Sequence, residues 1–224
     1  FEIILSLSKY LKMIKNLKNY IIKNDYDLIL TIDSPDFNYN LVSQLRKSNY
    51  KKKIIHIVAP TVWAWRSYRA KKFANIFDEI FLLFNFEKKY FNFQNLKKTF
   101  IGHPIFHIKK RKIKENYNYI AFLPGSRKNE VLKLLKYFNH IEEYINKNNL
   151  NFKIFIPTLP HLESFIKKSI KEWKTETIVL TDASKFDEYY DDVYISLTCS
   201  GTASLEIAKR NIPQIVIYKL NYFT

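Results

Sequence analysis

The chain has 224 residues, of which 47% are hydrophobic and 26% are charged, a composition that excludes an intrinsically disordered protein. Its formal net charge of +16 would suit an anionic partner such as nucleic acid, a membrane surface or a phosphorylated substrate. The lysines are spread along the chain rather than clustered, and Lys, Asn, Ile, Phe and Tyr are all abundant, so we favour compositional bias as the main source of the charge.

The first half of the chain predicts helices that alternate with short strands. Apolar residues at helical spacing, with lysines around them, predict a helix over residues 1–23. Apolar runs then predict a short buried strand at 27–32 and further strands at 53–58, 79–84 and 98–101. After the strand at 27–32 and its turn, a helix is expected up to about residue 48. After the strand at 53–58, another helix is expected from the Trp-Ala-Trp-Arg stretch to about residue 75.

The second half repeats this alternation after a polar break. Residues 108–118 are rich in Lys, Arg and Asn without an apolar period, so we expect a linker there. Strands are predicted at 119–123, 152–156, 177–180, 193–197 and 214–218, and helices at 128–147, 160–172 and 201–210. Alternation of this kind predicts parallel α/β sheets, in two units over 1–107 and 119–224.

Two carboxylates follow the first predicted strand, in the segment Asp33-Ser34-Pro35-Asp36. In open parallel sheets, ligands bind beyond the carboxyl ends of the strands. Asp33 directly ends the apolar run, so its carboxylate either accepts hydrogen bonds from the turn or acts on a ligand, as a general base or a sugar contact. Asp36 is better suited to capping the following helix.

The loop after the second strand contains Trp63-Ala64-Trp65-Arg66. Two aromatic rings beside a cation either form an apolar and cationic wall for an acyl or sugar group, or pack into the core. Taken alone, the segment favours core packing.

Two glycine-containing turns each open a predicted helix in the second half: Gly125-Ser126-Arg127 and Ser200-Gly201-Thr202. Backbone N–H groups at a helix N-terminus suit a phosphate, and Arg127 adds a guanidinium. Glu206, about one turn into its helix, either contacts a ribose diol or lies in solvent. Two such turns in one α/β unit favour a nucleotide diphosphate as ligand.

The remaining polar residues indicate no further chemistry. His103 lies at the junction of the two units and is as well explained by a structural role. No spacing of His, Cys or acidic residues indicates a metal site, and no apolar run approaches the roughly 20 residues that span a bilayer. Cys199 is the only cysteine, which excludes an internal disulfide and fits a reducing compartment. The chain opens without Met and ends without a closing element, so we expect a part of a longer protein that lacks both ends.

In their order, these segments resemble the successive signatures of the lipid-A-disaccharide synthase family. The resemblance rests on Ile32 to Asn38, Ala59-Pro60 with Trp63 to Arg66, Gly102-His103-Pro104, Leu123 to Arg127 with Glu130, and Ser200-Gly201-Thr202 with Glu206. It covers nearly the whole chain. The family's opening glycine-rich loop has no counterpart here, and Asn221-Tyr222-Phe223-Thr224 stands where Pro-Phe-Thr is usual.

The resemblance implies a GT-B glycosyltransferase, in which two Rossmann-like domains face each other across a cleft, both incomplete here. It implies transfer of 2,3-diacylglucosamine from UDP to the 6-hydroxyl of 2,3-diacylglucosamine 1-phosphate, with inversion and with neither metal nor cofactor. Asp33 becomes the expected general base and Arg127 the residue that balances the charge of departing UDP. The expected UDP contacts are Gly125, Ser126, Arg127, Ser200, Gly201, Thr202 and Glu206, and the expected acceptor or acyl contacts are Asp36, Trp63, Trp65, Arg66 and His103.

The resemblance also implies contact with the cytoplasmic face of the bacterial inner membrane. The first predicted helix matches a membrane-facing segment of the family, and its apolar residues with surrounding lysines fit an interfacial helix: Ile3, Ile4, Leu7, Tyr10 and Leu11. The expected partners are the two acylated glucosamine substrates and anionic lipid; a homodimer is compatible, and nucleic acid is not expected. We expect the isolated chain to be inactive, because segments that complete the UDP pocket are missing.

Two alternatives remain open. One is another GT-B enzyme that uses a UDP-sugar, such as a lipid II-type transferase or an epimerase, although these lack the Trp-Ala-Trp-Arg stretch. The other is a non-catalytic basic module that binds membrane or nucleic acid. The second is disfavoured because the aromatic residues follow core patterns rather than an RNA-stacking platform.

Overall fold

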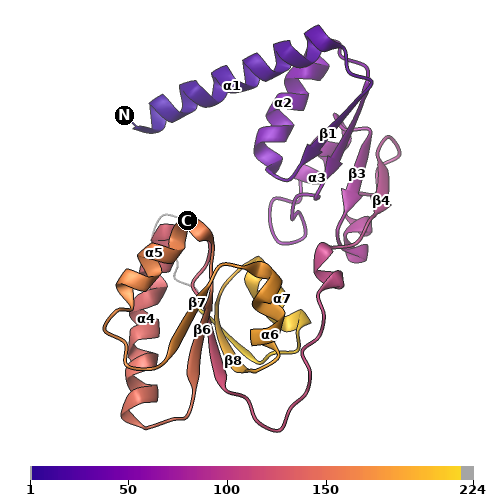
Figure 1. Cartoon of the computed structure of the whole chain (residues 1–224). Coiled ribbons are helices and arrows are strands. Elements are labelled where there is room, and N and C mark those ends of the chain that lie inside the picture. The colour runs from indigo at the N-terminus through magenta and orange to yellow at the C-terminus, as the bar shows by residue number, and fades with distance from the viewer. Residues whose placement is uncertain (1, 218–224) are drawn as a thin grey trace. The chain divides into compact units, whose positions relative to one another are not determined.

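The computed structural model describes the backbone of residues 2–217 and the side chains of residues 7–217. Predictions that concern Phe1, the side chains of Ile3 and Ile4, and residues 221–224 lie outside this description. The chain divides into two compact units, Phe1–His103 and Pro104–Thr224, each with its own parallel sheet and helices (Figure 1). The predicted α/β class is therefore confirmed. Within residues 2–217, no helix combines the length and the apolar character needed to cross a membrane.

The first unit is a four-stranded parallel sheet in the order β1-β2-β3-β4. Its helices are α1 (Glu2–Asn24), α2 (Pro35–Lys47), the short α3 (Arg69–Ala74) and the 3-10 turn η1 (Asn85–Lys89), and its strands are β1 (Leu28–Ile32), β2 (Lys53–Ile57), β3 (Glu79–Leu82) and β4 (Lys97–Phe100). The core joins the apolar side of α2 to the central strands and to a group of phenylalanines: Leu41, Val42, Leu45, Ile54, Ile80, Phe73, Phe77 and Phe91.

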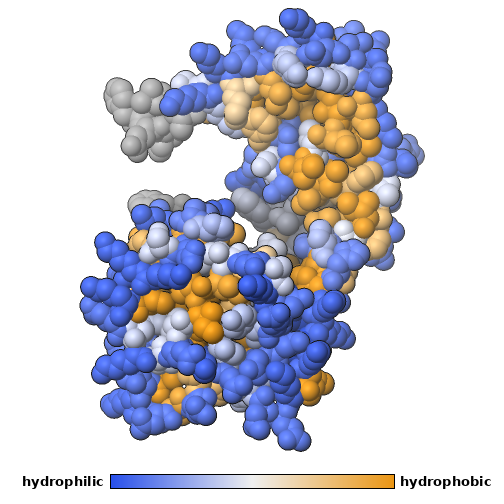
Figure 2. All heavy atoms as spheres, viewed as in Figure 1, coloured by the Kyte–Doolittle hydropathy of each residue, from blue (hydrophilic) through white to orange (hydrophobic). Residues whose placement is uncertain are grey.

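One face of this sheet stays open at its β1 edge. Leu28, Leu30 and Ile32 are all exposed, Ile32 by 64%, and the space-filling view shows apolar side chains gathered on an exposed face of this unit (Figure 2). The strand predicted at 27–32 is present, but the prediction that it is buried is wrong. Alternate residues of a strand point to opposite faces of the sheet, and no described layer covers the face that holds Leu28, Leu30 and Ile32.

The second unit is a five-stranded parallel sheet in the order β7-β6-β5-β8-β9. Its strands are β5 (Tyr119–Leu123), β6 (Lys153–Pro157), β7 (Thr177–Leu180), β8 (Val193–Cys199) and β9 (Gln214–Ile217). Its helices are α4 (Lys128–Lys147), α5 (Pro160–Ser169), α6 (Phe186–Tyr190) and α7 (Thr202–Lys209), with 3-10 turns η2 (Pro104–His107) and η3 (Ala183–Lys185). The chain moves outward in one direction from β5 to β7 and in the other from β8 to β9, so the strand order reverses between β5 and β8.

Helices cover both faces of this second sheet. Phe122 and its alternate neighbours pack under α4 and α5, against Leu134, Phe138 and Ile166. Ala121, Leu123 and Phe155 face the other way, against Tyr190 and Ile207 from α6 and α7. A sheet buried on both faces has near-continuous apolar strands, which explains why these strands were predictable from sequence.

The predicted linker, residues 108–118, lies inside the second unit as the contacts divide the chain, since the boundary falls between His103 and Pro104. The segment has no helix or strand but is anchored. Arg111 donates its backbone N–H to the Arg210 carbonyl at 2.9 Å, and its guanidinium donates to the Val193 carbonyl.

Local details depart from the predictions at two places in the first unit. No helix runs through Trp-Ala-Trp-Arg: residues 59–68 form turns and irregular loop, and α3 begins only at Arg69. Pro60 disfavours helix before it, and Arg66 has a φ of 53°, which interrupts any right-handed helix. Asp36 does not cap α2. The cap position is Ser34, in a left-handed conformation and without a side-chain hydrogen bond.

Candidate active site

A cavity of about 540 Å³ lies in the second unit beyond the carboxyl ends of β5, β6 and β8. It is where the strand order reverses, the position at which doubly wound sheets bind ligands, and its volume is in the range of about 300–1,000 Å³ usual for small-molecule sites. All seven residues expected to contact UDP line it: Gly125, Ser126, Arg127, Ser200, Gly201, Thr202 and Glu206. The sheet topology thus brings together two segments that are about 75 residues apart in the sequence.

The two glycine turns shape this cavity through their backbone. Gly125 and Gly201 have φ values of 98° and 128°, which side-chain-bearing residues rarely adopt. A Cβ on Gly125 would lie 3.1 Å from Oε2 of Glu130, whereas a Cβ on Gly201 would meet no atom within 4 Å. Gly201 precedes the first turn of α7, whose leading N–H groups have no intrahelical acceptor. The backbone there is open to an approaching ligand.

Arg127 is the N-cap residue of α4, and its side chain is 80% exposed. Its Nη1 lies 2.8 Å from Oε1 of Glu130, one turn into the helix. An ion pair this exposed stabilises the fold little, by roughly 0–1 kcal/mol. Replacing Glu130 by an anion in the cavity as the partner of this guanidinium would therefore cost little stability.

Glu206 is held rather than free in solvent. Its carboxylate accepts from Nη2 of Arg210 at 3.2 Å, and Nη1 of Arg210 also pairs with Asp187 at 2.6 Å. The Arg210 guanidinium lies 4.3 Å from the centre of the Tyr190 ring, and burial raises the pKa of the Tyr190 hydroxyl. This network fixes the orientation of Glu206 at the cavity wall.

Several cavity residues were not predicted from the sequence. Pro157 ends β6, Thr158 and Leu159 follow it, and Phe186 and Tyr190 come from α6. Thr158 could have been predicted from the sequence, since it comes shortly after the strand predicted at 152–156, at the same edge of the sheet. Its buried hydroxyl finds no hydrogen-bond partner among the described residues. Burial, followed by the nearby Glu130, raises the pKa of the Cys199 thiol, so this cysteine is a poor nucleophile.

Asp33 belongs to the first unit and directly follows β1. Asp33 and Ser34 have φ values of 51° and 43°, two successive left-handed residues without glycine, an arrangement that costs backbone energy and is concentrated at functional sites. The turn is held by the Asp33 N–H on the Ile57 carbonyl at 3.0 Å and by Asn38 Nδ2 on the Asp33 carbonyl at 2.6 Å. The Asp33 side chain is exposed, and no described group donates a hydrogen bond to its carboxylate.

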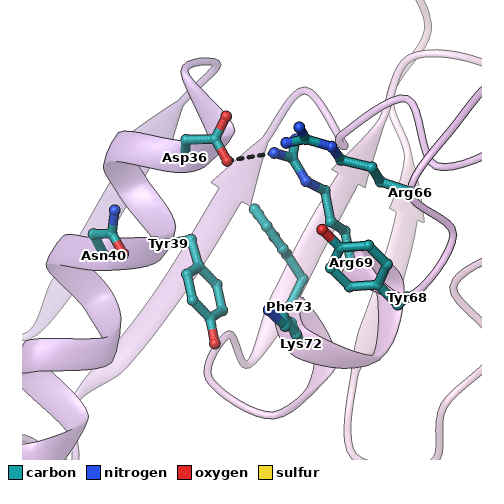
Figure 3. A pocket seen from close by; sticks show the side chains of 8 residues that line it. All are labelled: Asp36, Tyr39, Asn40, Arg66, Tyr68, Arg69, Lys72 and Phe73. Carbon is teal, nitrogen blue, oxygen red and sulfur yellow. Dashed lines mark hydrogen bonds and ion pairs between the residues drawn. The ribbon is translucent and has the colours of Figure 1, made fainter.

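The expected acceptor contacts form two groups within the first unit. Asp36 and Arg66 line a pocket between α2 and α3 (Figure 3). Trp63 and His103 belong instead to an aromatic row. Trp63 contacts Phe86 edge-on at 5.4 Å, and Phe84 stacks on both Phe86 and His103.

Trp65 connects to the first of these groups. The Arg66 guanidinium lies 4.0 Å from the centre of its ring. Trp65 is 55% exposed and Trp63 is exposed as well, so the core-packing interpretation of these tryptophans is wrong.

Comparison with known proteins decides the family. The family model described as lipid-A-disaccharide synthetase matches residues 1–224. The chain belongs to this family. It is 38% identical to the lipid-A-disaccharide synthase of Rickettsia conorii over 231 residues and 31% identical to that of Rhodospirillum centenum over 232, covering 98% of this chain in both.

The chain spans little more than half the length of these relatives, 51% and 58% respectively. Solved structures show the same fold at low identity. The S. aureus MnaA–UDP co-structure has a TM-score of 0.62 at 16% identity, covering 93% of this chain and 61% of its own, and Acinetobacter baumannii MurG has a TM-score of 0.53 at 12%, covering 93% and 57%. These neighbours support the GT-B fold class.

The described side chains include no cluster of potential metal ligands. Among residues 7–217, no group of three His, Cys, Asp or Glu side chains lies close enough to hold an ion.

Proposed function

We propose that this chain carries the donor-binding and acceptor-activating residues of an inverting glycosyltransferase of lipid A biosynthesis. The donor is UDP-2,3-diacylglucosamine and the acceptor is 2,3-diacylglucosamine 1-phosphate. The observation that carries the proposal is the cavity at the reversal of strand order, lined by both glycine turns, Arg127 and Glu206. Family membership favours a UDP-sugar enzyme over a module that binds nucleic acid or membrane without catalysis.

In this proposal the diphosphate of UDP lies against the Gly125 and Gly201 turns, with Arg127 leaving Glu130 to pair with it. Backbone N–H groups and a guanidinium stabilise charge that develops as UDP leaves. Glu206, oriented by Arg210, accepts from the ribose hydroxyls, and the unpartnered Thr158 hydroxyl is available to the ligand.

Asp33 takes the proton of the acceptor 6-hydroxyl in this proposal. The hydroxyl oxygen forms a bond to the anomeric carbon from the face opposite UDP, the bond from that carbon to the diphosphate oxygen breaks, and the configuration inverts. The exposed Asp33 carboxylate, free of hydrogen bonds from described residues, is suited to accept the proton.

Membrane contact and dimer formation are separate proposals. Leu7 and Leu11 of α1 are exposed and fit an interfacial helix. Tyr10, in contrast, packs edge-on against Phe37 at 5.7 Å, so we leave it out of the proposed membrane face. Nothing on the described surface argues for a particular dimer contact.

Two substitutions test the catalytic assignment by disaccharide formation and UDP release in the full-length protein. Asp33→Asn removes the base and is expected to lower kcat by about 100- to 10,000-fold. Arg127→Ala removes the phosphate partner and is expected to lower kcat by about 100- to 1,000-fold. Neither side chain supports the core, so circular dichroism and the melting temperature should stay near wild type.

Matched controls lie on the same elements. Asp27→Asn changes an exposed carboxylate before β1, and Lys136→Ala changes an exposed cation of α4; both should retain activity. Near-normal turnover in Asp33→Asn and Arg127→Ala would refute the roles proposed for these residues.

A further inference from the structure

A small cationic pocket lies in the first unit between α2, the turns after residue 59 and α3 (Figure 3). Its volume is about 220 Å³, below the roughly 300–1,000 Å³ of sites that enclose whole small molecules. It therefore suits a compact charged group rather than an acylated sugar. Figure 3 shows both arginines directed toward Asp36, with Tyr39 and Tyr68 on either side.

The side chains that line the pocket have more positive than negative charges. Arg66, Arg69 and Lys72 oppose one carboxylate, Asp36. The Arg69 side chain is only 13% exposed and is fixed by Asp36, 2.5 Å from its Nη2. In the part of the chain with described side chains, neither Arg66 nor Lys72 has an ion-pair partner. The pocket thus retains a formal charge of +2, which matches a phosphate monoester dianion.

Aromatic rings hold the two unpaired cations near the pocket. The Lys72 ammonium lies 4.9 Å from the centre of the Tyr68 ring and 5.9 Å from that of Tyr39. The guanidinium carbons of Arg66 and Arg69 lie 4.0 Å and 5.7 Å from the centre of the Trp65 ring. Stacking of this kind orients a cation without neutralising it.

The backbone at Arg66 has a conformation that is uncommon for arginine. Its φ of 53° is in the left-handed region, which costs a non-glycine residue energy and would suit glycine. A glycine here would therefore remove the guanidinium without adding backbone strain.

We propose that this pocket binds the phosphate of the acceptor, through Arg66 and Lys72 as direct contacts and Arg69 as a third cation that Asp36 positions. The inference rests on the proposed function, which supplies a phosphorylated acceptor. It adds the site by which a phosphorylated acceptor is distinguished from an unphosphorylated one. Charge-assisted hydrogen bonds to phosphate provide both affinity and orientation.

The test compares two acceptors that differ only in the 1-phosphate, presented to the full-length protein in neutral detergent. The variants are Arg66→Gly, which removes the guanidinium at a backbone conformation that glycine tolerates, and Lys72→Gln. Lys71→Gln is the matched control, since Lys71 is an exposed neighbour on α3 that does not line the pocket. The readout is the ratio of kcat/KM for the phosphorylated acceptor to kcat/KM for the unphosphorylated one.

We expect each pocket variant to lower this ratio by about 10- to 100-fold, the usual range for one lost bond to a charged group, mainly through the KM of the acceptor. The KM of the UDP-sugar and the melting temperature should stay near wild type, and Lys71→Gln should keep the ratio. Calorimetric Kd values for the two acceptors give the same ratio without turnover. An unchanged ratio in both variants overturns the proposal.

Two further outcomes are separable. A wild-type protein that forms no disaccharide refutes the proposed function, and the calorimetric ratio still decides whether the pocket recognises phosphate. A second arm measures flotation with vesicles of phosphatidylglycerol or of phosphatidylcholine. If the variants lose only their preference for phosphatidylglycerol and keep the acceptor ratio, the pocket binds lipid headgroups, which also overturns the proposal.

Discussion

Backbone conformation at single residues shapes both candidate sites. At the donor cavity the demanding positions are filled by glycine, at Gly125 and Gly201. In the first unit, left-handed φ values occur at residues that have side chains: Asp25, Asp33, Ser34, Asn49, Val58 and Arg66. Among these residues, Asp33 and Arg66 have exposed side chains at the candidate sites, where backbone strain is compatible with a functional role.

The two cavity glycines should differ in their response to alanine. Both substitutions place a side chain on a backbone with positive φ, which costs roughly 1–3 kcal/mol. At Gly125 the new methyl group also lies 3.1 Å from Oε2 of Glu130 and 3.4 Å from Sγ of Cys199, whereas at Gly201 it meets nothing within 4 Å. Gly125→Ala should therefore lower the free energy of unfolding more than Gly201→Ala, measured by urea denaturation. Equal losses would mean that contact with Glu130 is relieved without cost.

At the scale of elements, alternation of apolar runs was sufficient to predict nearly every strand and long helix. In the second unit, strands buried on both faces read as continuous apolar runs, and their predicted bounds differ from the observed ones by two residues at most. The exceptions are segments whose apolar residues show neither helical nor strand periodicity. The turns around Trp63 and Trp65 were mistaken for helix, and the five-residue helix α6 was missed.

The central strand β2 also introduces a buried titratable group. His56 is fully buried against the rings of Phe73 and Phe77, and its Nδ1 lies 2.8 Å from the Thr31 hydroxyl. Burial lowers the pKa of His56 from 6.5 to about 4, although the nearby Asp33 acts to raise it. The ring is therefore neutral in the folded protein at pH 7.

This burial predicts a loss of stability in weak acid. Between pH 6.5 and 4 the unfolded chain binds a proton at His56 that the folded chain does not, so the free energy of unfolding falls as the pH drops through this window. The shift corresponds to about 3 kcal/mol in total. His56→Leu should flatten this part of the curve, measured by urea denaturation at several pH values, while removal of the exposed His161 should not. The same slope in His56→Leu would assign the acid sensitivity elsewhere.

At the scale of the whole molecule, the proposed function assigns different residues to the two units. All residues of the donor cavity belong to the second unit, and that unit has its own buried core on both faces of its sheet. Residues 104–224 expressed alone are therefore expected to fold and to bind UDP with a Kd within about threefold of the whole chain, measured by calorimetry; a loss of UDP binding beyond about tenfold would show that the first unit contributes to the donor site.

By itself, the sequence determined the α/β class, the order of the main elements, and the segments that carry chemistry, because burial and helix periodicity leave a local pattern of apolar residues. Its ordered motifs also identified the family. Only the tertiary structure decided which of these segments meet. Gly125 and Gly201 line one cavity because β5 and β8 are neighbours in the sheet, a pairing that no local pattern encodes. The pairing of Asp36 with Arg69, and with it the cationic pocket, likewise depends on how α2 and α3 pack against the same sheet.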